Sequence, residues 1–284
     1  MKKLISSIFA VLILVSSCNQ EQDLSPVNNF EKEISFLTEM NKSGLNLTVS
    51  NLGKNITPIG NNEITLNQRQ LVKGMLSGLN GQYFNADEKT IMDFSSNYGE
   101  LRLPDHFANA RKNGTVDLST FEIYSEDQLA LVQPFVDDLL NEEDLNATKS
   151  KAISFQQSVV SSTLSDDEKI QLLTLSTGVI SFAEFVEDGG IDLIANELDI
   201  IYSSNGRVQG CSVSSRNVLA SAVVGLAGGA ATGGYVGATA GTFTVPILGT
   251  AVGGVGGAVF GGAAGFVSGL ISGVAAELLT SCGR

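Results

Sequence analysis

Few side chains in this 284-residue sequence stand at spacings that could support chemistry. Histidine occurs once, at His106, with no cysteine or carboxylate at the spacing of a metal site. A serine–histidine–aspartate set would have to use His106, and nothing around it indicates catalysis. The sequence contains neither a phosphate-binding loop nor a dinucleotide-binding glycine motif. We therefore expect no catalytic residues, no bound metal and no cofactor, and we predict that the protein is not an enzyme.

Carboxylates gather at Asp137–Asp138 and at Glu142–Asp144. A calcium loop needs alternating oxygen ligands around a central glycine, and neither cluster has that pattern. We interpret both clusters as solvated ends of helices. Residues 19–210 hold 29 of the 30 acidic residues but only 13 of the 17 basic ones, a net charge of −16. This negative charge argues against a nucleic acid partner.

Cysteine offers more specific chemistry, beginning with Cys18. The first eighteen residues, MKKLISSIFAVLILVSSC, combine two lysines, a short apolar run and small residues, as a secretory signal does. The ending LVSSC resembles a bacterial lipobox, which implies that Cys18 is lipidated and becomes the first residue of the mature chain. Its acyl chains would attach the protein stably to a membrane. An ordinary signal peptide and an uncleaved anchor are the alternatives.

The residue after the cysteine bears on localisation. By resemblance to Gram-negative lipoproteins, Asn19 in place of aspartate implies export to the outer membrane. We therefore expect a lipid-anchored protein of the cell envelope, with residues 19–27 as a tether.

Residues 28–204 are expected to form an acidic helical domain. Three serine or threonine residues stand three positions before a glutamine or glutamate, as in the capping boxes that begin helices: Thr65 with Gln68, Ser125 with Gln128, and Ser165 with Glu168. Pro134 lies within a helical pattern and predicts a kink or a restart there. The alternation in LNLTVSN, residues 45–51, indicates a short strand.

The C-terminal segment, residues 211–284, differs in composition. Sixty consecutive uncharged residues separate Arg216 from Glu277. As one helix they would extend about 90 Å, far beyond a hydrocarbon core of about 30 Å. Pro246 lies near the middle and cannot continue a helix. We therefore predict a hairpin of two helices, about 218–240 and about 248–279, with its turn at Pro246.

Glycine recurs at every fourth position in both arms of this hairpin. Residues four apart lie along one helix face, so a row of glycines leaves a groove into which another backbone can pack closely. In water so many glycines would weaken a helix severely, whereas in lipid the backbone has little alternative to helix. The helix-packing residues predicted in this way are Gly225, Gly229, Gly233, Gly237, Gly241, Gly249, Gly253, Gly257, Gly261, Gly265, Gly269 and Gly273.

The remaining two cysteines bracket the hairpin. Cys211 precedes Pro246 by 35 residues and Cys282 follows it by 36, so an antiparallel hairpin would bring them together. A disulfide between them suits an oxidising, exported compartment. The alternative is two free buried thiols.

The lipobox and the double row of glycines together resemble the glycine-zipper two-helix segments of outer-membrane lipoproteins. This resemblance covers the first 18 residues and about 218–279, and it implies a hairpin that inserts in or associates at the membrane. It also implies self-association into a homo-oligomer, or binding of an envelope protein partner. The hairpin is similar as well to hydrophobic, cysteine-closed bacteriocins, which implies a pore-forming protein with the acidic domain as a carrier segment.

Two further interpretations of the glycine-rich segment compete with membrane insertion. One is a hairpin buried in water against the acidic domain. The other is a flexible linker, although linkers carry serine and polar residues rather than Val, Leu and Phe. The sequence therefore predicts an all-α envelope lipoprotein with an acidic helical domain followed by a glycine-zipper hairpin.

Overall fold

The computed structural model describes residues 30–59, 63–66, 68–98, 114–121, 123–203, 213–240, 245 and 253–282. These residues are predominantly helical, which confirms the all-α class. Several predicted features lie outside the described residues: the lipid site Cys18, His106, Cys211, the turn at Pro246, Gly241 and Gly249. Cys282 is the last residue of a helix, and its side chain is also outside the described part. The lipidation and the disulfide therefore stay predictions.

The described part contains ten α-helices, one antiparallel pair of β-strands and one short 3₁₀ turn, η2 (Leu118–Phe121). Strands β1 (Ile56–Ile59) and β2 (Glu63–Leu66) pair antiparallel, with Ile56 opposite Leu66. The helices are α2 (Glu31–Ser50), α3 (Leu52–Asn55), α4 (Gln68–Leu79), α5 (Glu88–Tyr98), α7 (Glu126–Leu140), α8 (Leu145–Ser161), α9 (Asp166–Glu187), α10 (Gly190–Ser203), α11 (Ser215–Ala240) and α12 (Gly253–Cys282).

Local signals place two helix starts where the sequence predicts them. Ser125 and Ser165 are the N-caps of α7 and α9, and each forms a reciprocal capping box with the residue three positions later. The third predicted box is wrong, because Thr65 lies within β2 and pairs with Thr57 of β1. Helix α7 runs through Pro134 without restarting.

The short strand predicted for residues 45–51 is also wrong. Helix α2 continues to Ser50 and buries Leu45 and Thr48 on one face. The Thr48 hydroxyl donates to the Gly44 carbonyl at 2.8 Å, so the buried polar group is satisfied within the helix. Over seven residues the alternation of apolar side chains does not distinguish a strand from a helix that buries positions three apart.

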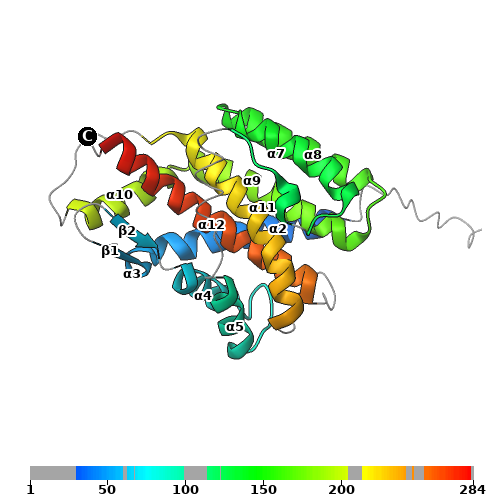
Figure 1. Cartoon of the computed structure of the whole chain (residues 1–284), viewed down its shortest axis with the longest axis horizontal. Coiled ribbons are helices and arrows are strands. Elements are labelled where there is room, and N and C mark those ends of the chain that lie inside the picture. Colours follow the sequence, from blue (N-terminus) through cyan, green and yellow to red (C-terminus); the bar gives the residue numbers. More distant parts are fainter. Residues whose placement is uncertain are drawn as a thin grey trace, which may run out of the picture.

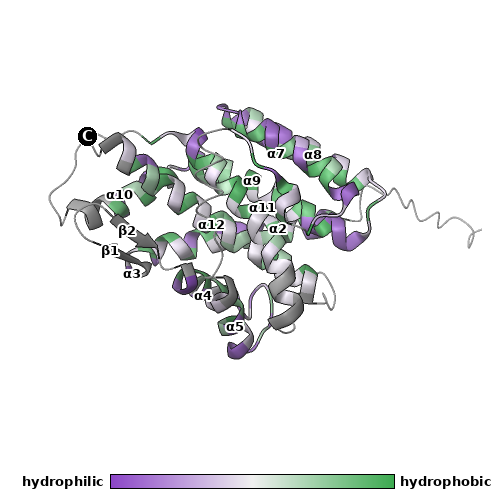
Figure 2. Ribbon diagram, viewed as in Figure 1, coloured by the Kyte–Doolittle hydropathy of each residue, from purple (hydrophilic) through white to green (hydrophobic). Residues whose placement is uncertain are grey.

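Helices α11 and α12 cross the middle of the molecule side by side, from the yellow to the red part of the chain (Figure 1). We call them the helix pair. Helices α5, α7 and α9 pack against α11, and α2, α4, α9 and α10 pack against α12. We call these six helices the cover. Hydrophilic residues are conspicuous on outer helices such as α7 and α8, whereas the helix pair is coloured mostly white and green (Figure 2).

The cover and the helix pair share one hydrophobic core. It extends from Phe30, before α2, to Leu278 in α12 without division into separate clusters. Two aromatic contacts join the parts: Phe84 lies 4.2 Å from Phe260 between ring centroids, and Phe182 meets Phe266 edge-on at 6.2 Å. Apolar side chains that are far apart in sequence therefore fold around the glycine-rich segment.

Candidate functional site, a buried glycine-rich helix pair

The two helices of the pair approach each other closely in their middle. A Cβ atom placed on Gly233 would lie 2.5 Å from the Gly261 Cα, and one placed on Gly257 would lie 2.6 Å from the Gly237 Cα. Each would lie even closer to a carbonyl oxygen of the facing helix. Real Cβ atoms do not approach other heavy atoms so closely, so these positions admit only glycine at this helix separation.

The contact continues toward the other end of the pair. A Cβ on Gly225 would lie 3.1 Å from the Gly269 Cα, and a Cβ on Gly273 would lie 3.0 Å from the Val218 Cα. Higher numbers on α12 thus face lower numbers on α11, which makes the two helices antiparallel. We call this continuous line of backbone contacts the seam.

The structure brings most of the predicted helix-packing residues into the seam. They are Gly225, Gly229, Gly233, Gly237, Gly257, Gly261, Gly265, Gly269 and Gly273. Ser221 also belongs to it, because a Cβ on Gly269 would run into its carbonyl group. Ser221 stands four residues before Gly225, so extending the four-residue spacing to all small residues would have found it.

Two further glycines lie where the helix pair packs against α9, and the sequence pattern does not predict their role. A Cβ on Gly178 of α9 would collide with a terminal methyl group of Leu226 and lie 3.3 Å from the other. A Cβ on Gly262 of α12 would lie 3.0 Å from the Thr174 methyl carbon. Here a glycine faces the tip of a side chain, whereas in the seam it faces backbone.

Three described helices are long and apolar enough to cross a membrane: Asp166–Glu187 in α9, Ser215–Gly234 in α11 and Gly254–Leu278 in α12. By length and composition they suit association with a membrane. Their most apolar windows are 67%, 89% and 89% buried within the protein, respectively. The helix pair is therefore both suited to lipid and enclosed by other helices.

Polar groups lie at the end of the pair where α11 begins and α12 ends. The carboxylate of Glu277 accepts from the Asn217 side-chain amide at 2.9 Å and from the Ser214 backbone N–H at 3.2 Å. These bonds join the two helices beside the seam. Arg216 stands at the same end of α11. The charges that flank the uncharged run thus lie together at one end of the helix pair.

The segment around α7 makes polar contacts with α11. The Tyr124 hydroxyl donates to the Ala227 carbonyl at 3.0 Å, and burial raises the pKa of this phenol. At the other end of α7, the Arg216 Nε donates to the Leu140 carbonyl at 3.4 Å. The Arg216 guanidinium also lies 3.8 Å from Glu143.

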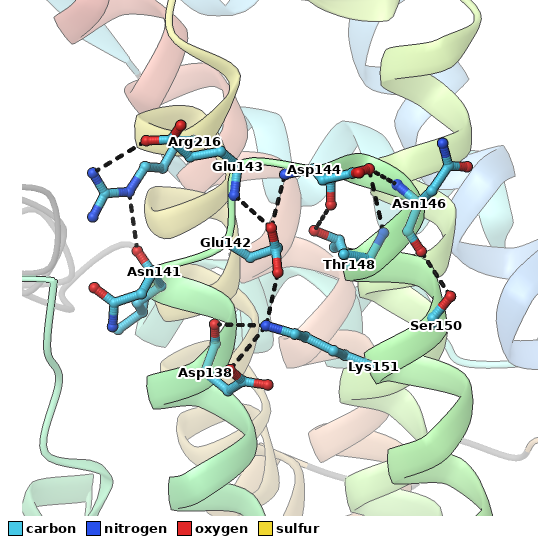
Figure 3. Close-up of polar contacts among 12 residues, drawn as sticks. Asp138, Asn141, Glu142, Glu143, Asp144, Asn146, Thr148, Ser150, Lys151 and Arg216 are labelled. Carbon is cyan, nitrogen blue, oxygen red and sulfur yellow. Dashed lines mark hydrogen bonds and ion pairs between the residues drawn. The ribbon is translucent and has the colours of Figure 1, made fainter.

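The loop between α7 and α8 is held by a charged network on the surface (Figure 3). Lys151 pairs with both Asp138 and Glu142 at 2.8 Å. The Glu142 carboxylate also accepts from the backbone N–H groups of Asp144 and Glu143. The hydrogen bond from Lys151, followed by those two N–H groups, lowers the pKa of Glu142 to about 2.

Comparison with protein families, with characterised proteins and with solved structures finds no match for this chain. Within the described ranges, no group of three or more histidine, cysteine or acidic side chains is placed to hold a metal ion. The helix pair and its contacts with the cover are therefore the features from which a function can be argued.

Proposed function

We propose that the protein is a non-enzymatic lipoprotein of the cell envelope that stores a membrane-inserting helical hairpin, α11–α12, beneath a cover of acidic helices. The lipid on Cys18 would hold the protein at the membrane. The hairpin would then leave the cover and enter the bilayer, where it anchors the protein or binds a partner.

One observation carries this proposal: the backbone-to-backbone contacts of the helix pair are internal. The seam joins backbone to backbone between α11 and α12, while the contacts with the cover involve side-chain tips such as Leu226 and Thr174. The pair can therefore leave the cover as a unit and keep its tightest packing. Such packing stabilises helix pairs in membranes, because small residues let helix backbones approach each other closely.

The composition of the pair supports the same proposal. A helix that is apolar on every side is stable either in a protein core or in lipid. Residues between Arg216 and Glu277 carry no charge, so insertion would drag no ion into the hydrocarbon. Arg216, Asn217 and Glu277 lie together at one end, where the membrane–water interface can solvate them.

A fluorescent reporter can test insertion, because the chain contains no tryptophan. Phe266→Trp places a single indole in the middle of α12, and Phe155→Trp places another, likewise buried in the wild type, in α8, which packs against α7 and α9. Both variants are mixed, as full chains, with vesicles of dibrominated phosphatidylcholine. We expect quenching of the reporter at 266 and little quenching of the one at 155. Equal, weak quenching of both reporters would rule out insertion and leave the pair as a permanent core.

A pore-forming or bacteriocin-like protein is the alternative function, because a hairpin stored beneath other helices would serve it equally well. Release of a dye trapped in the same vesicles separates the two. An anchor inserts without leakage, whereas a pore-former empties the vesicles at low ratios of protein to lipid.

Self-association through the glycines has a specific requirement in this fold. The seam is already filled within one chain, so a homo-oligomer built on it would need arms exchanged between chains. Replacing Gly257 and Gly261 with leucine would then abolish cross-linked oligomers in membranes. Oligomers that survive both substitutions would place the interface on another face.

The proposed anchor and disulfide are tested separately. Labelled palmitate should be incorporated into the wild type but not into Cys18→Ser. Alkylation before and after reduction should reveal two thiols, at Cys211 and Cys282, only in the reduced protein. Alkylation of both without reductant would favour free thiols instead.

A further inference from the structure

The contacts between α7 and α11 form a distinctive pattern. Tyr124, in the turn before α7, donates to Ala227 in the middle of α11. Leu140, the last residue of α7, accepts from Arg216 near the start of α11. Figure 3 shows Arg216 directed at the segment that joins α7 to α8. Polar contacts therefore fasten α7 to α11 at both of its ends.

The same segment is also bonded to α9 and to α8. The Ser125 hydroxyl donates to Glu168, and the Gln128 amide donates to Gln171, so the start of α7 is joined to the start of α9. At its other end, Lys151 of α8 holds Asp138 and Glu142. Because these bonds fix α7 to α9 and α8, α7 can hold α11 in place.

Helix α7 contains Pro134. A proline inside a helix removes one backbone hydrogen bond and crowds the preceding turn. The bonds of Tyr124 and Leu140 to α11 add to the capping box at Ser125 in holding α7 in place.

We propose that residues 124–143, which we call the strap, hold α11 within the cover, and that separation of the strap from α11 controls insertion of the helix pair. This proposal rests on the proposed function. Apolar contacts have no required direction, whereas the hydrogen bonds of Ala227 and Arg216 hold α11 against one place on the strap.

After separation, each polar group of these α7–α11 contacts can still form a hydrogen bond. The Ala227 carbonyl keeps its bond within α11, so it can enter lipid after losing Tyr124. The Tyr124 hydroxyl and the Leu140 carbonyl stay with the cover and can bond to water. Arg216 precedes the uncharged run and need not enter the hydrocarbon. The strap therefore works as a releasable contact.

The test compares two identical chemical changes. Tyr124→Phe removes the bond to α11. Tyr83→Phe removes a bond of similar length, 2.7 Å, between the hydroxyl groups of Tyr83 and Ser43, away from α11. Both are made in the full-chain protein that carries Phe266→Trp, with dibrominated phosphatidylcholine vesicles as the probe. Since one hydrogen bond contributes about 1 kcal/mol, we expect Tyr124→Phe to speed quenching about fivefold and Tyr83→Phe to leave its rate unchanged.

Amide hydrogen exchange without vesicles provides the second readout. We expect Tyr124→Phe to speed exchange in residues 215–240 by a similar factor, and Tyr83→Phe to have no such effect there. If insertion is still observed but the two variants have equal rates in both measurements, the strap does not control insertion. The proposed function would not be affected by that result. If Tyr124→Phe alone speeds amide exchange in residues 215–240 but the indole at position 266 is never quenched, the helix pair does not insert. That result would refute both the control of insertion and the proposed function.

Discussion

The helix pair has two kinds of surface, and they differ in what lies across from them. Along the seam, glycines of α11 face backbone atoms of α12, which cannot move without shifting a whole helix. Toward the cover, Gly178 and Gly262 face the ends of Leu226 and Thr174, which can rotate. The seam is therefore rigid and specific, while the surface toward the cover is adaptable. A pair with that combination can keep its internal geometry while exchanging one apolar surrounding for another.

The largest expected effect comes from filling the seam. Gly261→Ala should destabilise the protein by about 3 kcal/mol, because overpacking against backbone forces the helices apart. The neighbouring change Gly262→Ala is the matched control and should cost about 1 kcal/mol or less, since its Cβ would meet the Thr174 methyl at 3.0 Å and the Ala230 Cβ at 3.4 Å, with no backbone atom nearer than 3.7 Å. Chemical denaturation of the two variants measures the difference. Equal costs would mean that the seam is no tighter than its surroundings.

The next effect lies between the helix pair and the cover. Gly178→Ala should cost about 1–2 kcal/mol, because its Cβ displaces a methyl group of Leu226 rather than backbone. Shortening the partner should restore stability, so we expect the double variant Gly178→Ala/Leu226→Val to be more stable than the sum of the single changes predicts. A double-mutant cycle followed by denaturation measures this coupling. Strict additivity would argue against direct contact between the two residues.

A smaller effect, of opposite sign, is expected where a helical glycine faces nothing. Gly74 in α4 is exposed, and a Cβ there would meet no atom within 4 Å. Gly74→Ala should therefore stabilise the protein by about 0.5–1 kcal/mol through helix propensity alone. A rise in the thermal midpoint tests this expectation. Destabilisation would show that glycine matters at this position for a reason other than close packing.

The surface network between α7 and α8 is expected to matter least and to depend on pH. Glu142 has its pKa lowered from 4.5 to about 2 in the folded protein. A lowered pKa stabilises the fold fully above pH 4.5, and that contribution disappears as the pH falls toward 2. Glu142→Gln should therefore lower the thermal midpoint at pH 6, and its difference from the wild type should shrink between pH 4.5 and 2. A difference independent of pH would contradict this account.

Much of the helical structure follows from local residue patterns. The starts of α7 and α9 are predictable because Ser125 and Ser165 bond to residues only three positions away. The apolar segments of α11 and α12 are evident from composition and from four-residue spacing. Residues 45–50 continue α2 instead of forming the expected strand, because their apolar positions suit either structure and the packing of α2 decides between them.

The candidate site was predictable to a similar degree. Regular spacing identified Gly233 and Gly261, because residues that share a helix face recur every four positions. Gly178 carries no such signal, since it is a single glycine within α9 whose role depends on Leu226, far away in sequence. Tyr124 was missed for the same reason: its partner Ala227 is 103 residues away.

By itself the sequence determined that this chain contains two long, uncharged helices with glycine on one face, because charge, composition and periodicity are local properties. Only the tertiary structure decided what surrounds them. A helix that is apolar on all sides satisfies its surface equally well in lipid or against other apolar side chains, so its residues cannot select between the two. The folded chain places α2, α9 and their neighbours around the pair, because their buried faces supply the apolar partners that water lacks.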